Sequence, residues 1–267
     1  RTEGNTRYYD NQQLRRLLNL VSLQETGRRI SELSALSDEE LFDLLKQQLS
    51  QETVAPNHNY LISQLLAAGM SYDHHNFEKM LAHCLLRFGM KATYTEIVYP
   101  MLQRIGLLWA TDELPPGQEH FISHFLRQKL YTAIDSLPAA PKEASSWLLF
   151  LPENEFHEMG LLMAEYLLKL AGQRTLYLGA NLPLSSVAAA GEDWPADNLL
   201  LFLVHRDTPE NVEQYLQQLR QYFPMSRLLL SASLGILEQV KLPLHAHWLQ
   251  SLTDLEKLLE DETIQII

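Results

Sequence analysis

The stretch WLLFLPENEFHEMG, residues 147–160, decides the fold of the C-terminal half of this 267-residue chain. Its apolar run Trp147–Leu151 is typical of a buried strand, and a polar turn leads from it into a helical pattern at about 158–171. The alternation then repeats, with apolar runs at 175–178, 199–204 and 227–230 and helical stretches at about 184–190 and 209–222. This rhythm predicts a doubly wound parallel sheet over 147–267, whose ligands bind at the carboxyl ends of the strands.

The preceding residues contain helical patterns only. Helices are expected near 58–68, 74–88, 92–111 and 117–136, separated by Gly69, Gly89 and the Pro115-Pro-Gly117 break. Short connections predict a four-helix bundle over 58–137. Proline-containing linkers poor in large apolar residues are expected at 50–57 and 138–146. Residues 1–49, with a capping box at Ser37–Glu40, are too short for a complete domain.

The charge is distributed unevenly. The net charge is −12, yet residues 1–30 hold six arginines against Glu3, Asp10 and Glu25, a balance of +3 that leaves −15 on the rest. Phosphate attraction needs a basic surface, so only the N-terminal edge is suited to DNA.

Compartment and enzyme class follow from what the sequence lacks. The sequence has no apolar run of transmembrane length and no signal-peptide pattern, so we expect a cytoplasmic protein without a membrane partner. The single Cys84 excludes an internal disulfide and a cysteine-built metal site, and it is expected to pack in a helix. His74, His75 and His83 offer weak support for a metal. The sequence has no phosphate-binding glycine loop and no hydrolase motif, so an enzyme is not expected.

The pattern Glu155-x-His157-x-x-Gly160 follows the first strand, where a doubly wound fold binds its ligand. The imidazole could coordinate a metal through one nitrogen while Glu155 accepts a hydrogen bond from the other. Gly160 would let the backbone approach a large flat ligand. The alternative is that Glu155 and His157 only cap the helix.

This pattern resembles the cobalamin-binding domain family, with Glu155 in place of the family's Asp. The segment LGANLPL, residues 178–184, is also similar to that family. The resemblance implies that His157 is the lower axial ligand of cobalt in a cofactor such as adenosylcobalamin.

Two other parts of the family signature keep their spacing but not their residues. Phe202-Leu-Val204 stands where the family has Ser-x-Leu, and Ser231-Ala232 stands where it has Gly-Gly. In the family those small residues clear a channel for the nucleotide tail of cobalamin. The larger side chains of Phe202 and Ala232, together with Leu200, should narrow that channel. The narrowing is not easily relieved, because overpacking a core costs about 1–3 kcal/mol. A tail-less tetrapyrrole such as biliverdin or haem is the expected alternative ligand.

A second motif, Trp109 followed after nine residues by Glu119-His120, resembles the light-sensing MerR regulators of the CarH and LitR type. In that type the bundle caps the corrin, so the resemblance implies that these three residues contact the pigment. Ala110 stands where the family pattern has a histidine after the Trp. His120 or His124 would have to take the role of that histidine. Without the resemblance, a core Trp and an exposed Glu-His pair in a first turn are the ordinary interpretation.

A third motif, RTEGNTRYYD at residues 1–10, resembles the wing of the MerR winged helix, whose recognition helix would precede residue 1. It implies phosphate contacts from Arg1, Arg7 and Tyr8. The expected fold is therefore a partial winged helix (1–49), a four-helix bundle (58–137) and a cobalamin-type α/β domain (147–267). The expected function is a DNA-binding, homo-oligomeric transcriptional regulator gated by a tetrapyrrole or by light. The alternatives are a corrinoid carrier of a methyltransferase and a degenerate sensor that binds nothing.

Overall fold

The computed structural model describes residues 16, 20, 29–37, 40, 41, 44, 58–110, 115–203, 208–232 and 239–264. The chain divides into two compact units, 1–125 and 126–267, and each is described by itself. The wing residues Arg1, Arg7 and Tyr8 and the linker 50–57 lie outside the described residues. Among the described helices, none combines the length and the apolar character needed to cross a bilayer.

The described part of the first unit is helical. A short helix α2 covers Ile30–Leu33, and the predicted capping box follows it, with the Ser37 amide donating to Glu40 Oε2 (2.7 Å) and the Glu40 amide to Ser37 Oγ (3.2 Å). The longer helices are α4 (His58–Met70), α5 (His74–Thr93), the π-helix η1 (Tyr94–Val98), α6 (Tyr99–Ala110) and the start of α7 (Pro116–Asp135).

The predicted helix break at Gly89 is confirmed, and only the start of the next helix differs from the prediction. The sequence predicted that one helix ends before Gly89 and the next begins near residue 92. Gly89 does break the helical geometry, with φ +77° and ψ 172°, but the helix resumes at once and runs on to Thr93. A π-helical turn follows, and it ends two residues before Pro100, whose ring nitrogen has no hydrogen to donate within the helix.

An aromatic cluster contributes to the core of the first unit. The ring of Phe77 packs edge-on against Phe121 and Phe125, with centroids 5.9 and 5.2 Å away. A Cβ on Gly69 would lie 2.4 Å from Ile122 Cδ1, so this glycine is what lets α4 approach α7. Cys84 is fully buried in α5, as the sequence predicted, and burial raises the pKa of its thiol to about 11.

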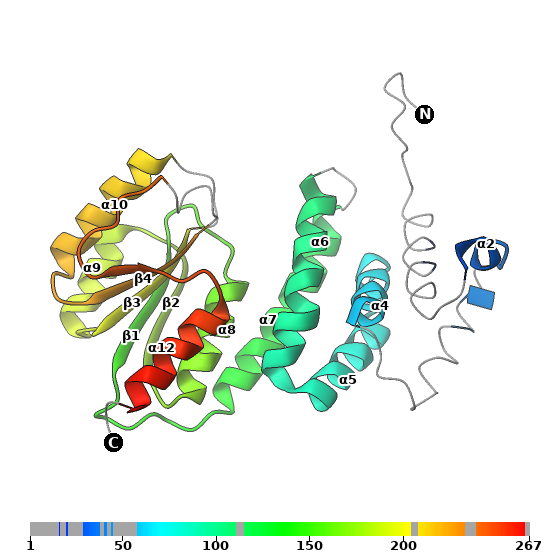
Figure 1. Ribbon diagram of the computed structural model, residues 1–267, viewed down its shortest axis with the longest axis horizontal. Helices are drawn as coiled ribbons and strands as arrows, with labels where there is room; N and C mark the ends of the chain where they lie inside the picture. Colours follow the sequence, from blue (N-terminus) through cyan, green and yellow to red (C-terminus); the bar gives the residue numbers. More distant parts are fainter. Residues whose placement is uncertain are drawn as a thin grey trace. The chain divides into compact units, whose positions relative to one another are not determined.

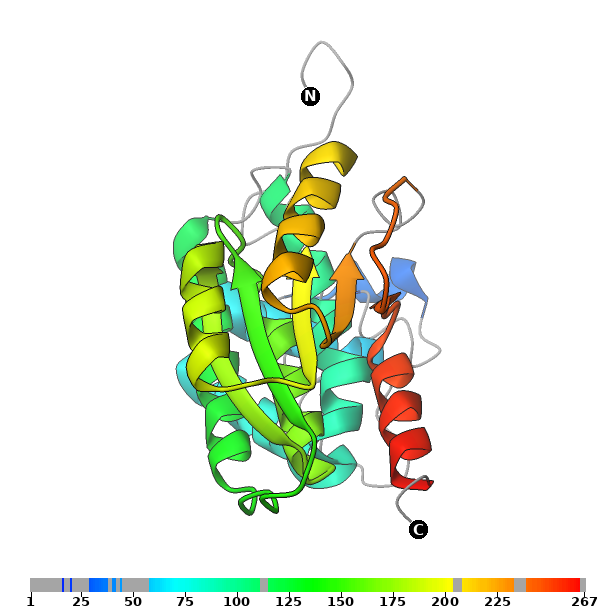
Figure 2. The same ribbon diagram turned by 90° about the vertical axis from the view of Figure 1, so that its left-hand side faces the viewer.

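The second unit contains the end of α7 and a five-stranded parallel sheet in the order β2-β1-β3-β4-β5 (Figure 2). The strands are β1 (Ser146–Pro152), β2 (Arg174–Leu182), β3 (Asn198–Leu203), β4 (Arg227–Ala232) and β5 (Ala246–Trp248). The helices are α8 (Met159–Leu170), α9 (Leu184–Asp193), α10 (Pro209–Tyr222) and α12 (Leu252–Ile264). The predicted doubly wound parallel sheet is confirmed.

Helices cover both faces of this sheet, with α8 and α12 on one side and α9 and α10 on the other (Figure 1). The residues of β1 alternate between the two cores: Trp147, Leu149 and Leu151 pack with α8 and α12, and Leu148 and Phe150 with α9 and α10. All five are fully buried. Burial on both faces explains why the strands appear in the sequence as continuous apolar runs.

The edge strand β2 is irregular where it passes the end of β1. Its pairing with β1 shifts register between Leu149 and Phe150 and again between Phe150 and Pro152. Two residues of β2 have positive φ there, Gly179 at +86° and Asn181 at +59°. These bulges turn the Asn181 side chain toward the loop that follows β1, where it accepts a hydrogen bond from a backbone amide.

Candidate ligand site at the carboxyl end of β1

The loop between β1 and α8 lies at the switch point of the sheet. From β1 the chain order runs outward to β2 on one side and to β3, β4 and β5 on the other. The loops after β1 and β3 therefore leave the sheet in opposite directions, and doubly wound proteins bind ligands in the crevice between them. The motif Glu155-x-His157-x-x-Gly160 begins in the loop after β1.

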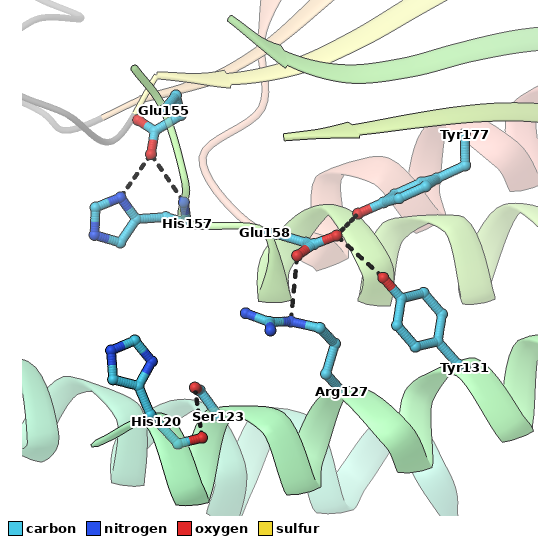
Figure 3. A network of polar contacts seen from close by, with 8 residues as sticks. All are labelled: His120, Ser123, Arg127, Tyr131, Glu155, His157, Glu158 and Tyr177. Atoms are coloured by element: carbon cyan, nitrogen blue, oxygen red, sulfur yellow. Dashed lines mark hydrogen bonds and ion pairs between the residues drawn. The ribbon is translucent and has the colours of Figure 1, made fainter. Parts of the chain in front are cut away.

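One carboxylate oxygen of Glu155 interacts with three nitrogen atoms of the next two residues. Its Oε1 accepts a hydrogen bond from the Phe156 amide (2.9 Å). The same oxygen accepts a hydrogen bond from the His157 amide (3.0 Å) and lies 2.6 Å from His157 Nδ1 (Figure 3). The carboxylate is buried, with 3% of its side chain exposed, whereas 63% of the imidazole is exposed. Because Nδ1 faces the carboxylate, Nε2 is the nitrogen through which His157 would coordinate a metal.

The loop is also fastened to β2. The Asn154 amide donates to Asn181 Oδ1 (2.8 Å), and the Asn181 amide donates to the Glu155 carbonyl oxygen (3.1 Å). Asn154 itself has a positive φ of +67°, a conformation that asparagine adopts more readily than most residues. The backbone that carries Glu155 and His157 is thus fixed before any ligand arrives.

Glu158, the residue after His157, is the centre of a polar network that the sequence did not reveal. Its Oε1 accepts hydrogen bonds from Tyr177 Oη of β2 (3.0 Å) and Tyr131 Oη of α7 (3.2 Å), and its Oε2 forms an ion pair with Arg127 Nε of α7 (3.2 Å) (Figure 3). Burial, and then the charge of Glu158, raise the pKa of both tyrosines. Both hydroxyls therefore remain protonated donors at neutral pH.

Gly160 and Phe202 occupy the same small space. A Cβ on Gly160 would lie 2.5 Å from Phe202 Cε2 and 3.1 Å from its Cδ2. The glycine that was predicted to admit a flat ligand therefore makes room for the phenyl ring. The ring of Phe202 therefore fills the space beside the start of α8.

The predicted convergence of three bulky side chains on one channel is wrong for Ala232. Leu200 and Phe202 pack on the face of α8 and α12, but Ala232 packs on the face of α9 and α10. The register explains the difference: Phe202 pairs with Ser231, and Ala232 pairs with Leu203, so Phe202 and Ala232 have opposite parity. Val204 lies outside the described residues.

The residues of the second motif lie in the predicted elements. Trp109 is near the end of α6, although its side chain is outside the described residues, and Glu119 and His120 are in the first two turns of α7. His120 is exposed, with its Nδ1 3.8 Å from Glu119 Oε2, and its ring stacks on His124 at a centroid distance of 5.9 Å.

The other histidines of the first unit give no metal site. His74 packs edge-on against Phe125, with ring centroids 5.1 Å apart. Within the described ranges, three or more His, Cys, Asp or Glu side chains nowhere gather closely enough to hold an ion.

Comparisons with known proteins match this arrangement. A family model described as "B12 binding domain" matches residues 61–133, from α4 into α7. The chain is 28% identical over 228 residues to the HTH-type transcriptional repressor CarH of Myxococcus xanthus, which covers 84% of this chain and 75% of CarH. It is 31% identical over 118 residues to the repressor CarA of the same organism, which covers 44% of this chain and 39% of CarA.

A solved structure has the same fold. The monomethylamine corrinoid protein of Methanosarcina barkeri matches with a TM-score of 0.57 at 13% identity, over 78% of this chain and 98% of that one. At that identity the likeness concerns the fold alone. By sequence, this chain is similar to the repressors CarH and CarA, and its residues 61–133 match the B12 binding domain model.

Proposed function

We propose that the chain is a DNA-binding transcriptional regulator whose helical bundle and α/β domain bind a tetrapyrrole, and that binding controls oligomerisation and DNA affinity. The observation that carries the proposal is the Glu155–His157 pair, a buried carboxylate 2.6 Å from the Nδ1 of an exposed imidazole at the switch point of the sheet. A carboxylate that orients an imidazole is the usual support of a metal-ligating histidine.

The relatives support the regulatory part of the proposal. CarH and CarA are both named as HTH-type transcriptional repressors, and CarH aligns along most of this chain. We assign DNA contact to residues 1–49 through Arg1, Arg7 and Tyr8, the cap to 58–137, and the ligand-binding α/β domain to 147–267. The fold is shared with the monomethylamine corrinoid protein, so a corrinoid carrier is the second candidate.

The residues of the loop fit the metal of a cobalamin. His157 would bind through Nε2, and Glu155 would hold its Nδ1 and so fix the ring orientation. A bound corrinoid or haem would supply a metal ion that an imidazole nitrogen can ligate.

The nucleotide tail of cobalamin fits less well. Phe202 takes the place of a small residue and its ring contacts Gly160, so the space next to α8 is already filled. We therefore propose that the site favours a tetrapyrrole without a buried tail, such as haem or biliverdin, or a cobalamin whose tail lies elsewhere. Trp109, Glu119 and His120 are proposed, from the sequence motif, to contact the same pigment.

The test is an absorption spectrum of the full chain mixed separately with adenosylcobalamin, haem and biliverdin, in the dark and after illumination. Binding of a metal pigment through His157 predicts a shifted spectrum that His157→Ala removes or changes. His247→Ala is the matched control, because His247 is an exposed histidine of the same unit on β5. An unchanged spectrum and affinity in His157→Ala would refute the axial-ligand assignment.

A second pair of measurements tests the regulatory role. Analytical ultracentrifugation with and without the bound pigment, and light where the pigment responds to it, should reveal a change in oligomeric state. DNA sequences selected from a random pool by the full-length protein should lose affinity when Arg7 is replaced by Gln. A protein that binds a pigment but selects no DNA would favour the corrinoid carrier.

A further inference from the structure

Glu158 is held from two directions. Its side chain is 15% exposed, and the carboxylate is shared among Tyr177 of β2 and Arg127 and Tyr131 of α7. Arg127 and Tyr131 are four residues apart, so they lie on one side of α7. Hydrogen bonds to a charged acceptor are stronger and more directional than those between neutral groups. The network therefore joins α7 to the residue that follows His157.

The backbone of Glu158 leaves little freedom between this network and His157. The Glu158 amide donates to the Phe156 carbonyl oxygen (2.8 Å), and the Glu158 carbonyl oxygen accepts from Leu162 in the first turn of α8. Glu158 is the N-cap residue of α8, yet its side chain makes no capping hydrogen bond. Its carboxylate therefore bonds to α7 and β2 and does not cap the start of α8.

We propose that Glu158 is a positioning residue that couples the conformation of the His157 loop to α7. The proposal rests on the proposed function in one respect, that His157 moves or stiffens when it binds a pigment. A change at His157 is transmitted to Glu158, because the two are adjacent and the hydrogen bonds of Glu155 and Asn181 leave the loop little freedom to absorb it. This change then alters the hydrogen bonds to Tyr131 and Arg127, and so changes α7, the helix that carries Glu119 and His120.

The first experiment needs no pigment and measures amide hydrogen exchange in the full chain. The reporters are the amides of Phe156 and His157, which are protected by Glu155 Oε1. Loss of the charge in Glu158→Gln, or of its partner in Arg127→Gln, should speed exchange of both amides by about tenfold or more, the loss expected for one charged hydrogen bond. Exchange along residues 127–135 should rise as well in Glu158→Gln.

Two controls separate coupling from general loosening. Glu153→Gln removes the same charge from an exposed position of the same loop, and Lys129→Gln removes a positive charge from another side of α7. Both should leave the reporters within about twofold of wild type. A residue that only supports α8 would change exchange in the first turn of α8 alone. Unchanged Phe156 and His157 exchange in Arg127→Gln would overturn the proposal.

The second experiment uses whichever of adenosylcobalamin, haem or biliverdin binds. Pigment should change exchange over residues 127–135 in wild type, and Glu158→Gln should abolish that change while the visible spectrum of the bound pigment persists. A change of equal size in Glu158→Gln would overturn the coupling. If no pigment binds, the proposed function fails, and the pigment-free exchange still decides whether Glu158 joins the loop to α7.

Discussion

Replacing Gly160 with alanine tests directly whether Phe202 fills the space beside α8. The new Cβ would lie 2.5 Å from Phe202 Cε2, a distance at which the ring must move. The phenyl ring is rigid, and overpacking of this kind costs about 1–3 kcal/mol. Gly160 is helical, so the loss of backbone entropy in the unfolded chain stabilises the variant by roughly 0.5–1 kcal/mol. The clash outweighs this gain, and a net loss of roughly 1–2 kcal/mol is expected.

A double-mutant cycle isolates the contact. In a Phe202→Ser background the clash is gone and only the helical gain remains, so Gly160→Ala should be neutral or stabilising there. The coupling energy should be roughly 1–3 kcal/mol. Phe202→Leu, which removes the far edge of the ring and keeps an apolar side chain, completes the cycle if Phe202→Ser does not fold.

Urea unfolding followed by circular dichroism measures each corner of the cycle. Gly106→Ala is the matched control, because Gly106 is also helical and a Cβ there meets no described atom within 4 Å. That control should stabilise the protein by up to about 1 kcal/mol. An equal effect of Gly160→Ala in both backgrounds would refute the contact and, with it, the steric case against a buried cobalamin tail.

Three further predictions use single residues. Hydrogen bonds from the Ser146 amide and hydroxyl lower the pKa of Asp197. The stability advantage of wild type over Asp197→Asn should therefore be present near neutral pH and shrink as pH falls below about 3.9. Urea unfolding midpoints measured across this pH range would test it. Burial raises the pKa of Glu165, so Glu165→Gln should gain stability relative to wild type as pH rises above about 4.3; a pH-independent difference would contradict this. The buried Cys84, whose thiol pKa is raised to about 11, should react with a thiol reagent only after denaturation, and rapid labelling of native protein would show the burial to be wrong.

The parallel sheet could be predicted from the sequence because the inner strands β1, β3 and β4 are buried over most of their length. Runs such as Trp147–Leu151 are continuous for that reason, and α10 was predicted at its observed bounds. The strand β5 was missed, since Ala246–Trp248 has only three residues and an exposed His247 interrupts its apolar character. A strand this short gives no periodicity to detect.

The site was predictable only where its residues are neighbours in the sequence. Glu155 and His157 are two positions apart, so their contact needs only a turn after β1. The partners of Glu158 come from α7 and β2, and no local pattern relates Arg127 or Tyr131 to a residue of another element. Similarly, the placement of Phe202 and Ala232 depends on strand register, which spacing along the chain does not determine.

The irregular edge of β2 has a consequence for the behaviour of the protein at high concentration. A regular edge strand offers a row of unpaired amides and carbonyls on which another chain can template a strand, which is a common route to aggregation. In β2 the two register shifts and the left-handed residues Gly179 and Asn181 interrupt that row. The opposite edge, β5, is only three residues long. The bulges that fasten the His157 loop thus also protect the sheet against edge-to-edge self-association.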